Sequence, residues 1–116
     1  MELQAIIEKL KMLEYHQSLL LKMNISTSEA FYKLIIEKSL SEEEVNQLYR
    51  KCEQLSIDYE EQKAEGFVYF HPLFQKFIQV LPPKLTVEEV IFACLKQGLY
   101  VPLMTEFKKY LNKRLR

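Results

Sequence analysis

Two histidines and two cysteines are the residues of this 116-residue sequence best suited to acid–base or metal chemistry. Histidine titrates near neutral pH, and together with cysteine it is a common zinc ligand. The spacing of His16, Cys52, His71 and Cys94 matches no recurrent zinc motif. Neither histidine has a Glu three residues before it, as a four-helix di-iron site requires. We therefore expect no metal site and no cofactor.

His71 is the strongest catalytic candidate because it lies in an aromatic-rich stretch, EGFVYFHPLFQKF, at residues 65–77. A general base needs a nucleophile or an orienting carboxylate, and no nearby pattern supplies either. The proline after His71 favours extended backbone at the histidine, which is typical of a junction between two helices. Residues 67–70 could alternatively form a short extended segment that pairs between chains. We expect no catalytic residue here, and we expect the aromatic residues to anchor the turn in the core.

The other candidates have structural interpretations. His16 flanks an apolar stripe, so we expect partial burial or an oligomer contact. Cys52 and Cys94 lie on apolar stripes, where cysteine behaves as a small buried hydrophobic residue. The sequence contains no glycine-rich phosphate loop, nucleophile elbow or metalloprotease motif. These observations predict a protein that is not an enzyme.

Six helices are predicted to position these residues. Three helix starts carry a capping-box pattern, a hydroxyl residue followed three positions later by Glu, at Ser26, Ser41 and Thr86. The residues that suit helix ends and first turns are Gly66, Gly98, Pro72 and Pro102. With the apolar periodicity, these signals predict helices near 2–23, 27–39, 42–65, 72–81, 87–97 and 102–114. The expected fold class is therefore all-α, a compact single domain over residues 1–116 with a long N-terminal helix.

The first predicted helix carries more apolar surface than a simple two-stranded seam needs. Its apolar residues recur at alternating steps of three and four, and one polar residue, Gln17, interrupts them. Such a surface must pack either into the domain core or against another chain. The predicted oligomer interface consists of Leu3, Ile6, Ile7, Leu10, Leu13, Gln17 and Leu20. We expect a homo-oligomer that acts through protein–protein contact, with dimer, trimer and higher states all open.

The charges balance overall, since 16 basic residues face 16 acidic ones, but they are segregated along the chain. Residues 41–65 are mainly acidic, and residues 106–116 are mainly basic. The candidate basic partner-binding face consists of Lys108, Lys109, Lys113, Arg114 and Arg116. A basic amphipathic helix can bind nucleic acid, anionic lipid or an acidic protein, so a nucleic-acid-associated regulator is the alternative function. A docked terminal helix with a solvated basic face explains the same pattern.

The expected location is cytoplasmic, without a membrane span. The longest apolar runs are far shorter than the roughly 20 residues that a spanning helix needs. The N-terminus has no basic start followed by an apolar block, and the two single cysteines do not form a disulfide framework.

Four segments carry a family resemblance: LEYHQSLLLK at 13–22, FYKLIIEKSLSEEE at 31–44, QKAEGFVYF at 62–70 and IFACLKQGLYVPLM at 91–104. Together they make the chain similar to the YhaI-type family of small, uncharacterised Bacillus proteins. The resemblance implies a multihelical fold and a homo-oligomer, and it supplies no catalytic residues. In a member of that family an Asp stands at the position of His71, and the Pro72 position also differs. This departure weakens a histidine mechanism further.

Overall fold

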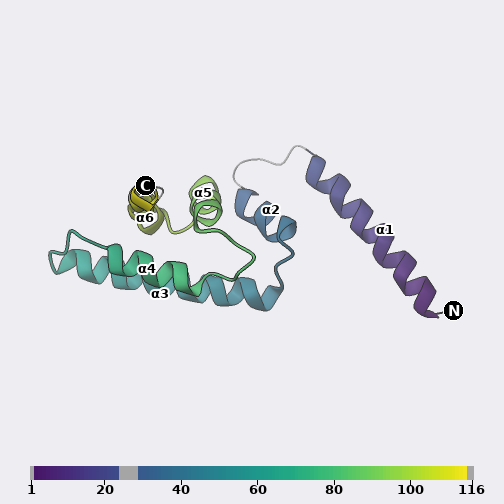
Figure 1. Cartoon of the computed structure of the whole chain (residues 1–116), viewed down its shortest axis with the longest axis horizontal. Helices are drawn as coiled ribbons and strands as arrows, with labels where there is room; N and C mark the ends of the chain where they lie inside the picture. The colour runs from purple at the N-terminus through teal and green to yellow at the C-terminus, as the bar shows by residue number, and fades with distance from the viewer. Residues whose placement is uncertain (1, 24–28, 115–116) are drawn as a thin grey trace.

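The structure is a computed structural model that describes residues 2–23 and 29–114. The helices are α1 (Glu2–Lys22), α2 (Ala30–Glu37), α3 (Glu42–Ala64), α4 (His71–Val80), α5 (Val87–Gln97) and α6 (Val101–Arg114) (Figure 1). The described residues contain no strand, so the all-α prediction with a long N-terminal helix is confirmed. The predicted extended segment at 67–70 is irregular backbone and belongs to no sheet within this chain.

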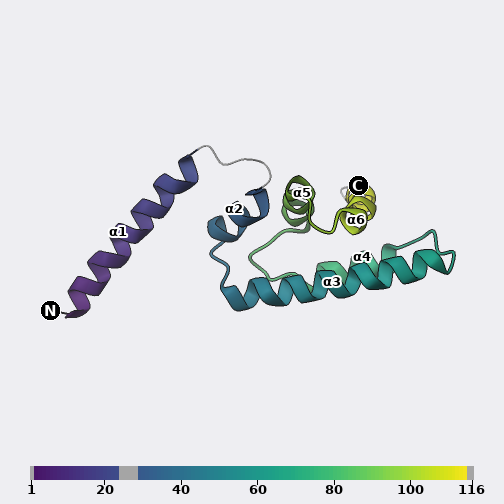
Figure 2. The same cartoon turned by 180° about the vertical axis from the view of Figure 1, so that it is seen from behind.

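Helices α2 to α6 pack into one body. The long helix α3 runs beside α4, while α5 lies against both α2 and α6, and α6 also contacts α3 and α4 (Figures 1 and 2). Aromatic rings fill the centre, where Phe107 of α6 packs on two rings of α4, Phe74 at 5.5 Å and Phe77 at 5.1 Å between centroids. All three rings are fully buried. The apolar residues of α3 to α6 therefore meet in one shared core.

The helix starts depend partly on local sequence and partly on tertiary contacts. The predicted capping boxes at Ser41 and Thr86 are both present, with reciprocal bonds to Glu44 and Glu89. Ser26, the start of the remaining predicted capping box, lies outside the described residues. Helix α2 begins at Ala30 rather than near 27, and the Gln97 side chain accepts hydrogen bonds from the first helical N–H groups. A residue of α5 thus supplies the cap that α2 lacks locally.

Three helices end in the same type of turn, in which a residue with positive φ follows the last helical carbonyls. Gly66 (φ 97°) and Gly98 (φ 78°) occupy this position after α3 and α5, as predicted, while Ser39 (φ 56°) occupies it after α2. In each case the next residue donates its N–H back into the helix: Phe67 to Gln62, Leu99 to Cys94 and Leu40 to Ile35. These are Schellman-type ends that satisfy the terminal carbonyls.

The aromatic stretch between α3 and α4 is only partly anchored. The prediction that its aromatic residues anchor the turn in the core is correct for Phe70, which is buried against Tyr59 at 4.7 Å between ring centroids. It is wrong for Phe67 and Tyr69, which are exposed, as is Val68 between them. Phe70 is therefore the buried residue of this turn, while its three predecessors are largely exposed in the single chain.

Helix α1 stands apart from the body (Figures 1 and 2). None of its residues is buried. The radius of gyration is 17.6 Å, whereas a compact chain of this length is expected at about 13 Å. Of the two predicted destinations for the apolar stripe of α1, the core of its own domain is therefore not the one observed.

Candidate functional site: the exposed face of the first helix

The apolar face of α1 is the largest group of unpacked hydrophobic side chains in the described chain. Five of the predicted interface residues, Leu3, Ile6, Leu10, Leu13 and Leu20, each expose more than half of their surface, from 53% at Leu13 to 68% at Leu3. Ile7 is also exposed, and Gln17 lies on the same face. Single exposed apolar residues are ordinary on protein surfaces, but a continuous apolar face of this length marks an interaction site.

The C-terminal part of this face adjoins the body. Gln17 borders an open cavity of about 560 Å³ whose other walls come from the end of α2, the start of α3 and Lys84. A second, shallower cavity of about 400 Å³ is lined by α1 residues alone, including Ile7, Leu10 and Leu13. The exposed face therefore extends along α1, and near Gln17 it adjoins the body.

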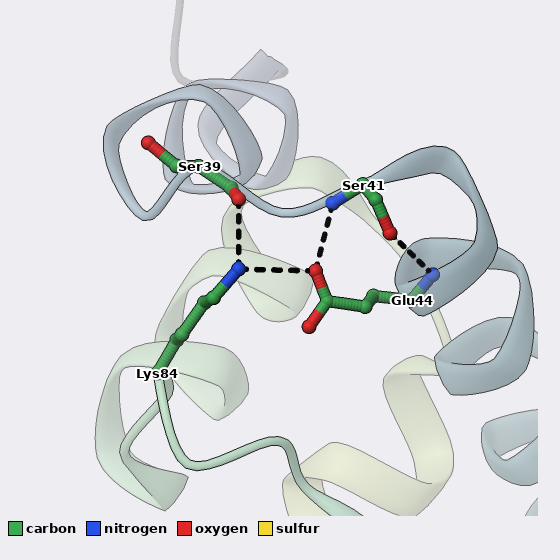
Figure 3. Close-up of polar contacts among 4 residues, drawn as sticks. All are labelled: Ser39, Ser41, Glu44 and Lys84. Atoms are coloured by element: carbon green, nitrogen blue, oxygen red, sulfur yellow. Dashed lines mark hydrogen bonds and ion pairs between the residues drawn. The ribbon is translucent and has the colours of Figure 1, made fainter.

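The floor of the larger cavity is held by a polar cluster at the exit of α2 (Figure 3). The Lys84 ammonium donates to the Ser39 carbonyl at 3.0 Å and to Glu44 Oε1 at 3.2 Å. The same carboxylate accepts the Ser41 N–H at 2.9 Å. The Ser41 backbone bond and then the Lys84 bond hold the pKa of Glu44 below its usual value. These bonds join the α4–α5 connection to the α2–α3 turn.

His71 lies among aromatic rings. It stacks on Tyr69 at 5.9 Å between centroids and meets Tyr110 edge-on at 5.5 Å. Among the described residues, the polar group within hydrogen-bonding distance of its ring is the Gln75 amide, at 3.3 Å. His71 does lie at a junction between two helices, but the extended backbone predicted for it is wrong, because His71 is the first residue of α4 and Pro72 is the second. Among the described residues, no carboxylate is recorded in contact with its ring. His16 on α1 is exposed, so the predicted partial burial is not observed within the single chain.

A buried carboxylate close to this joint was not predicted. Glu106 of α6 is 8% exposed and accepts a hydrogen bond from the Tyr110 hydroxyl at 3.2 Å. The Tyr110 oxygen in turn accepts the buried Phe70 N–H at 2.9 Å, and Lys109 pairs with Glu106 at 3.2 Å. Burial raises the pKa of Tyr110, which keeps its hydroxyl protonated and able to donate. These bonds satisfy the backbone at the end of the aromatic turn. The spacing of Glu106 and Tyr110, one helical turn apart, was the available signal for such a pair.

The two cysteines are buried, as predicted, at 1% exposure each. Burial raises the pKa of both thiols to about 12. A thiol must be deprotonated to attack an electrophile or bind a metal, so both are unreactive at neutral pH. Within the described ranges, no three His, Cys, Asp or Glu side chains converge in a way that could hold a metal ion.

Two residues of the predicted basic face, Lys108 and Lys109, contact other side chains of the same chain. Lys108 lies over the Phe92 ring at 5.6 Å from its centroid, and Lys109 pairs with Glu106. Lys113 and Arg114 belong to α6, and Arg116 lies outside the described residues. The nucleic-acid alternative stays a prediction that these contacts do not strengthen.

In the part of the chain that the structure describes, no helix has the length and apolar character needed to cross a membrane.

A comparison with known families assigns the chain to one of them. The sequence matches, over residues 1–112, the family described as "Protein of unknown function (DUF1878)". This match spans all six helices, including the exposed α1. The chain belongs to the DUF1878 family.

Proposed function

We propose that this protein is a non-enzymatic, self-associating interaction module, and that copies of the chain assemble through the apolar face of α1. The observation that carries the proposal is the contrast between a well-packed body and a 21-residue helix with no buried residue. Most helical stability in proteins comes from packing of an apolar face, and α1 has no such packing within its own chain. Contact with another chain would supply that packing.

A second copy of the chain suits this face better than a membrane surface does. Helices that lie on membranes are rich in Lys and Arg on their polar face. Helix α1 carries three acidic residues, Glu2, Glu8 and Glu14, and three basic ones, Lys9, Lys11 and Lys22, so it has no net attraction to anionic lipid. The alternating three- and four-residue steps of its apolar residues are the spacing by which helices pack on one another. The exposed face is therefore self-complementary.

The free energy available from this packing is of the same order as the cost of association. Complete burial of a Leu or Ile side chain stabilises by roughly 1.5–3 kcal/mol, and the five residues of the stripe are each more than half exposed. A pair of helices therefore has on the order of 10 kcal/mol of apolar burial to gain before the cost of association. The neighbouring Ile7 and Leu21 would add to this gain in assemblies of more than two helices.

Light scattering coupled to size exclusion tests the proposal. We expect the wild-type chain to be oligomeric at micromolar concentration, and the double variant Leu10→Glu, Leu13→Glu to be monomeric with its helical body intact. The matched control, Gln4→Glu with Ser18→Glu, adds the same two charges to α1 outside the apolar stripe and should assemble normally. A strictly monomeric wild type, or a fully assembled Leu10, Leu13 variant, would contradict the proposal.

Two finer assignments accompany it. We propose that the chain is a YhaI-type member of its family, supported by the four segments at 13–22, 31–44, 62–70 and 91–104. We also propose a cytoplasmic location, supported by two buried free cysteines, which suit a reducing compartment.

A further inference from the structure

We infer, on the basis of the proposed self-association, that the α1 helices of neighbouring copies pair in parallel and in register, and that Gln17 sets this orientation. The stripe Leu3, Ile6, Leu10, Leu13, Gln17 and Leu20 follows steps of three, four, three, four and three residues. In the seven-residue notation of coiled coils, Leu3, Leu10 and Gln17 then occupy a positions. Ile6, Leu13 and Leu20 occupy d positions. All six lie on the exposed face of one continuous helix.

The single polar residue in this stripe distinguishes the two orientations. When helices pair in parallel, each a residue meets the a residue of its partner, so Gln17 meets a second Gln17. A side-chain amide has both a donor and an acceptor, so the two amides can satisfy each other. When helices pair antiparallel, each a residue faces a d residue, and every d residue here is apolar. Gln17 would then be buried against Ile6, Leu13 or Leu20 without a partner, which is unfavourable.

The charges beside the stripe favour the same orientation. Lys9 and Glu14 occupy the g and e positions that flank the seam. In a parallel pair, Lys9 of one helix lies beside Glu14 of the next, and the symmetry repeats this ion pair. In the antiparallel pair with the fullest overlap, Lys9 instead lies beside His16, and Glu14 lies beside Ile7. The attraction between these opposite charges is therefore present only in the parallel arrangement.

The orientation also decides where the bodies lie. Gln17 borders the cavity formed with the end of α2 and the start of α3, so the body adjoins the C-terminal part of the stripe. Parallel pairing brings the bodies, and the cavities beside Gln17, together at one end of the paired helices. Antiparallel pairing would separate them by most of the length of α1.

Disulfide trapping tests the orientation. The single substitutions Leu3→Cys and Leu20→Cys place a thiol near each end of the stripe, about 26 Å apart along one helix. A disulfide requires Cα atoms within about 7 Å, so each cross-link reports one orientation. Wild type under the same mild oxidation is the control, because Cys52 and Cys94 are buried and their thiols have a pKa of about 12. It should form no cross-link.

In the parallel arrangement, each variant alone forms a covalent dimer. In an equimolar mixture, one variant carries a mass tag, so that the mixed product, which joins one Leu3→Cys chain to one Leu20→Cys chain, can be identified. This mixed product should be at least about tenfold rarer than the symmetric products, because a buried unpaired amide disfavours the antiparallel form. A dominant mixed product would overturn the inference while leaving self-association intact. A monomer in light scattering would instead refute the proposed function itself. An oligomer that forms neither type of cross-link would show that α1 is not the seam.

A second pair of variants isolates the role of Gln17. With Gln17→Leu added to both cysteine variants, every layer becomes apolar and assembly should persist, but the mixed product should rise at least about tenfold because the unpaired-amide penalty is gone. If the mixed product stays as rare as before while the oligomer remains parallel, Gln17 does not set the orientation.

Discussion

Helices α1 and α5 both carry apolar residues on one face and have opposite environments. Helix α5 buries Val87, Val90, Ile91, Ala93 and Cys94 between α2 and α6, whereas α1, which is almost twice as long, buries nothing. What differs is the presence of neighbours along the same chain. An apolar stripe therefore shows that a helix needs a partner, and only the tertiary structure shows whether the chain provides one.

The contrast divides the stability of this protein into two parts. Contacts within α2 to α6 are intramolecular, so their contribution does not depend on protein concentration. The proposed contacts of α1 with another copy would follow mass action and weaken on dilution. Substitutions in the two regions should therefore respond differently to concentration, and this difference can be measured.

The largest effect is expected from a core truncation compared with a truncation on α1. Phe77 is fully buried, so Phe77→Ala should lower the free energy of unfolding of the body by about 3–5 kcal/mol at every protein concentration. Leu10 is 59% exposed, so Leu10→Ala should cost little in dilute solution and should lower stability only where copies assemble. Chemical denaturation at two protein concentrations measures both effects. A large loss for Leu10→Ala under dilute conditions would show that α1 packs on its own body.

A smaller effect is expected where the body holds the start of α2. Gln97→Ala removes the acceptor of the Phe31 and Tyr32 N–H groups, so the free energy of unfolding should fall by about 1 kcal/mol, as for loss of an ordinary helix cap. The control Gln54→Ala removes an exposed side-chain bond to Asp58 and should cost a few tenths of a kcal/mol at most. Self-association should be unchanged in both variants. Equal losses would mean that the Gln97 bonds do not stabilise α2.

Local signals predicted most of the fold. Ser41, Thr86, Gly66 and Gly98 act on their immediate neighbours in the chain, so their positions mark helix ends in the sequence itself. The start of α2 could not be found this way, because its cap comes from Gln97, more than 60 residues later. The predicted interface residues could be identified as a stripe from periodicity. Their exposure could not, because it depends on the packing of every other helix.

The aromatic joint shows the same limit. The sequence indicated a turn between Gly66 and Pro72. It did not indicate that Phe70 would be the buried residue of this turn. That burial depends on the contact of the Phe70 ring with Tyr59 and on the hydrogen bond from the Phe70 N–H to Tyr110. Tyr110 and Glu106 were hidden in a helix whose basic residues dominated the pattern. A polar pair that serves a distant backbone group has no signature near that group.

The smallest expected effect lies at the turn between α2 and α3. Of the three Schellman-type turns described above, this is the one with a residue other than glycine at the positive-φ position. Ser39 has φ 56°, where a Cβ atom is strained by roughly 1–2 kcal/mol, and its side chain is exposed. Ser39→Gly relieves that strain. It also makes the unfolded chain more flexible, which lowers the free energy of unfolding by about 0.5–1 kcal/mol. We therefore expect a net stabilisation of about 0.5 kcal/mol.

The bond from Lys84 reaches the backbone carbonyl of residue 39, so Ser39→Gly retains it. The control Ser39→Ala keeps the Cβ atom and removes only the hydroxyl, and it should give no stabilisation. Chemical denaturation of both variants separates the two contributions. A gain in Ser39→Ala equal to that in Ser39→Gly would assign the strain to the hydroxyl rather than to the backbone. Because this turn belongs to the body, the gain should be the same in dilute and concentrated solution, unlike any change made on the exposed face of α1.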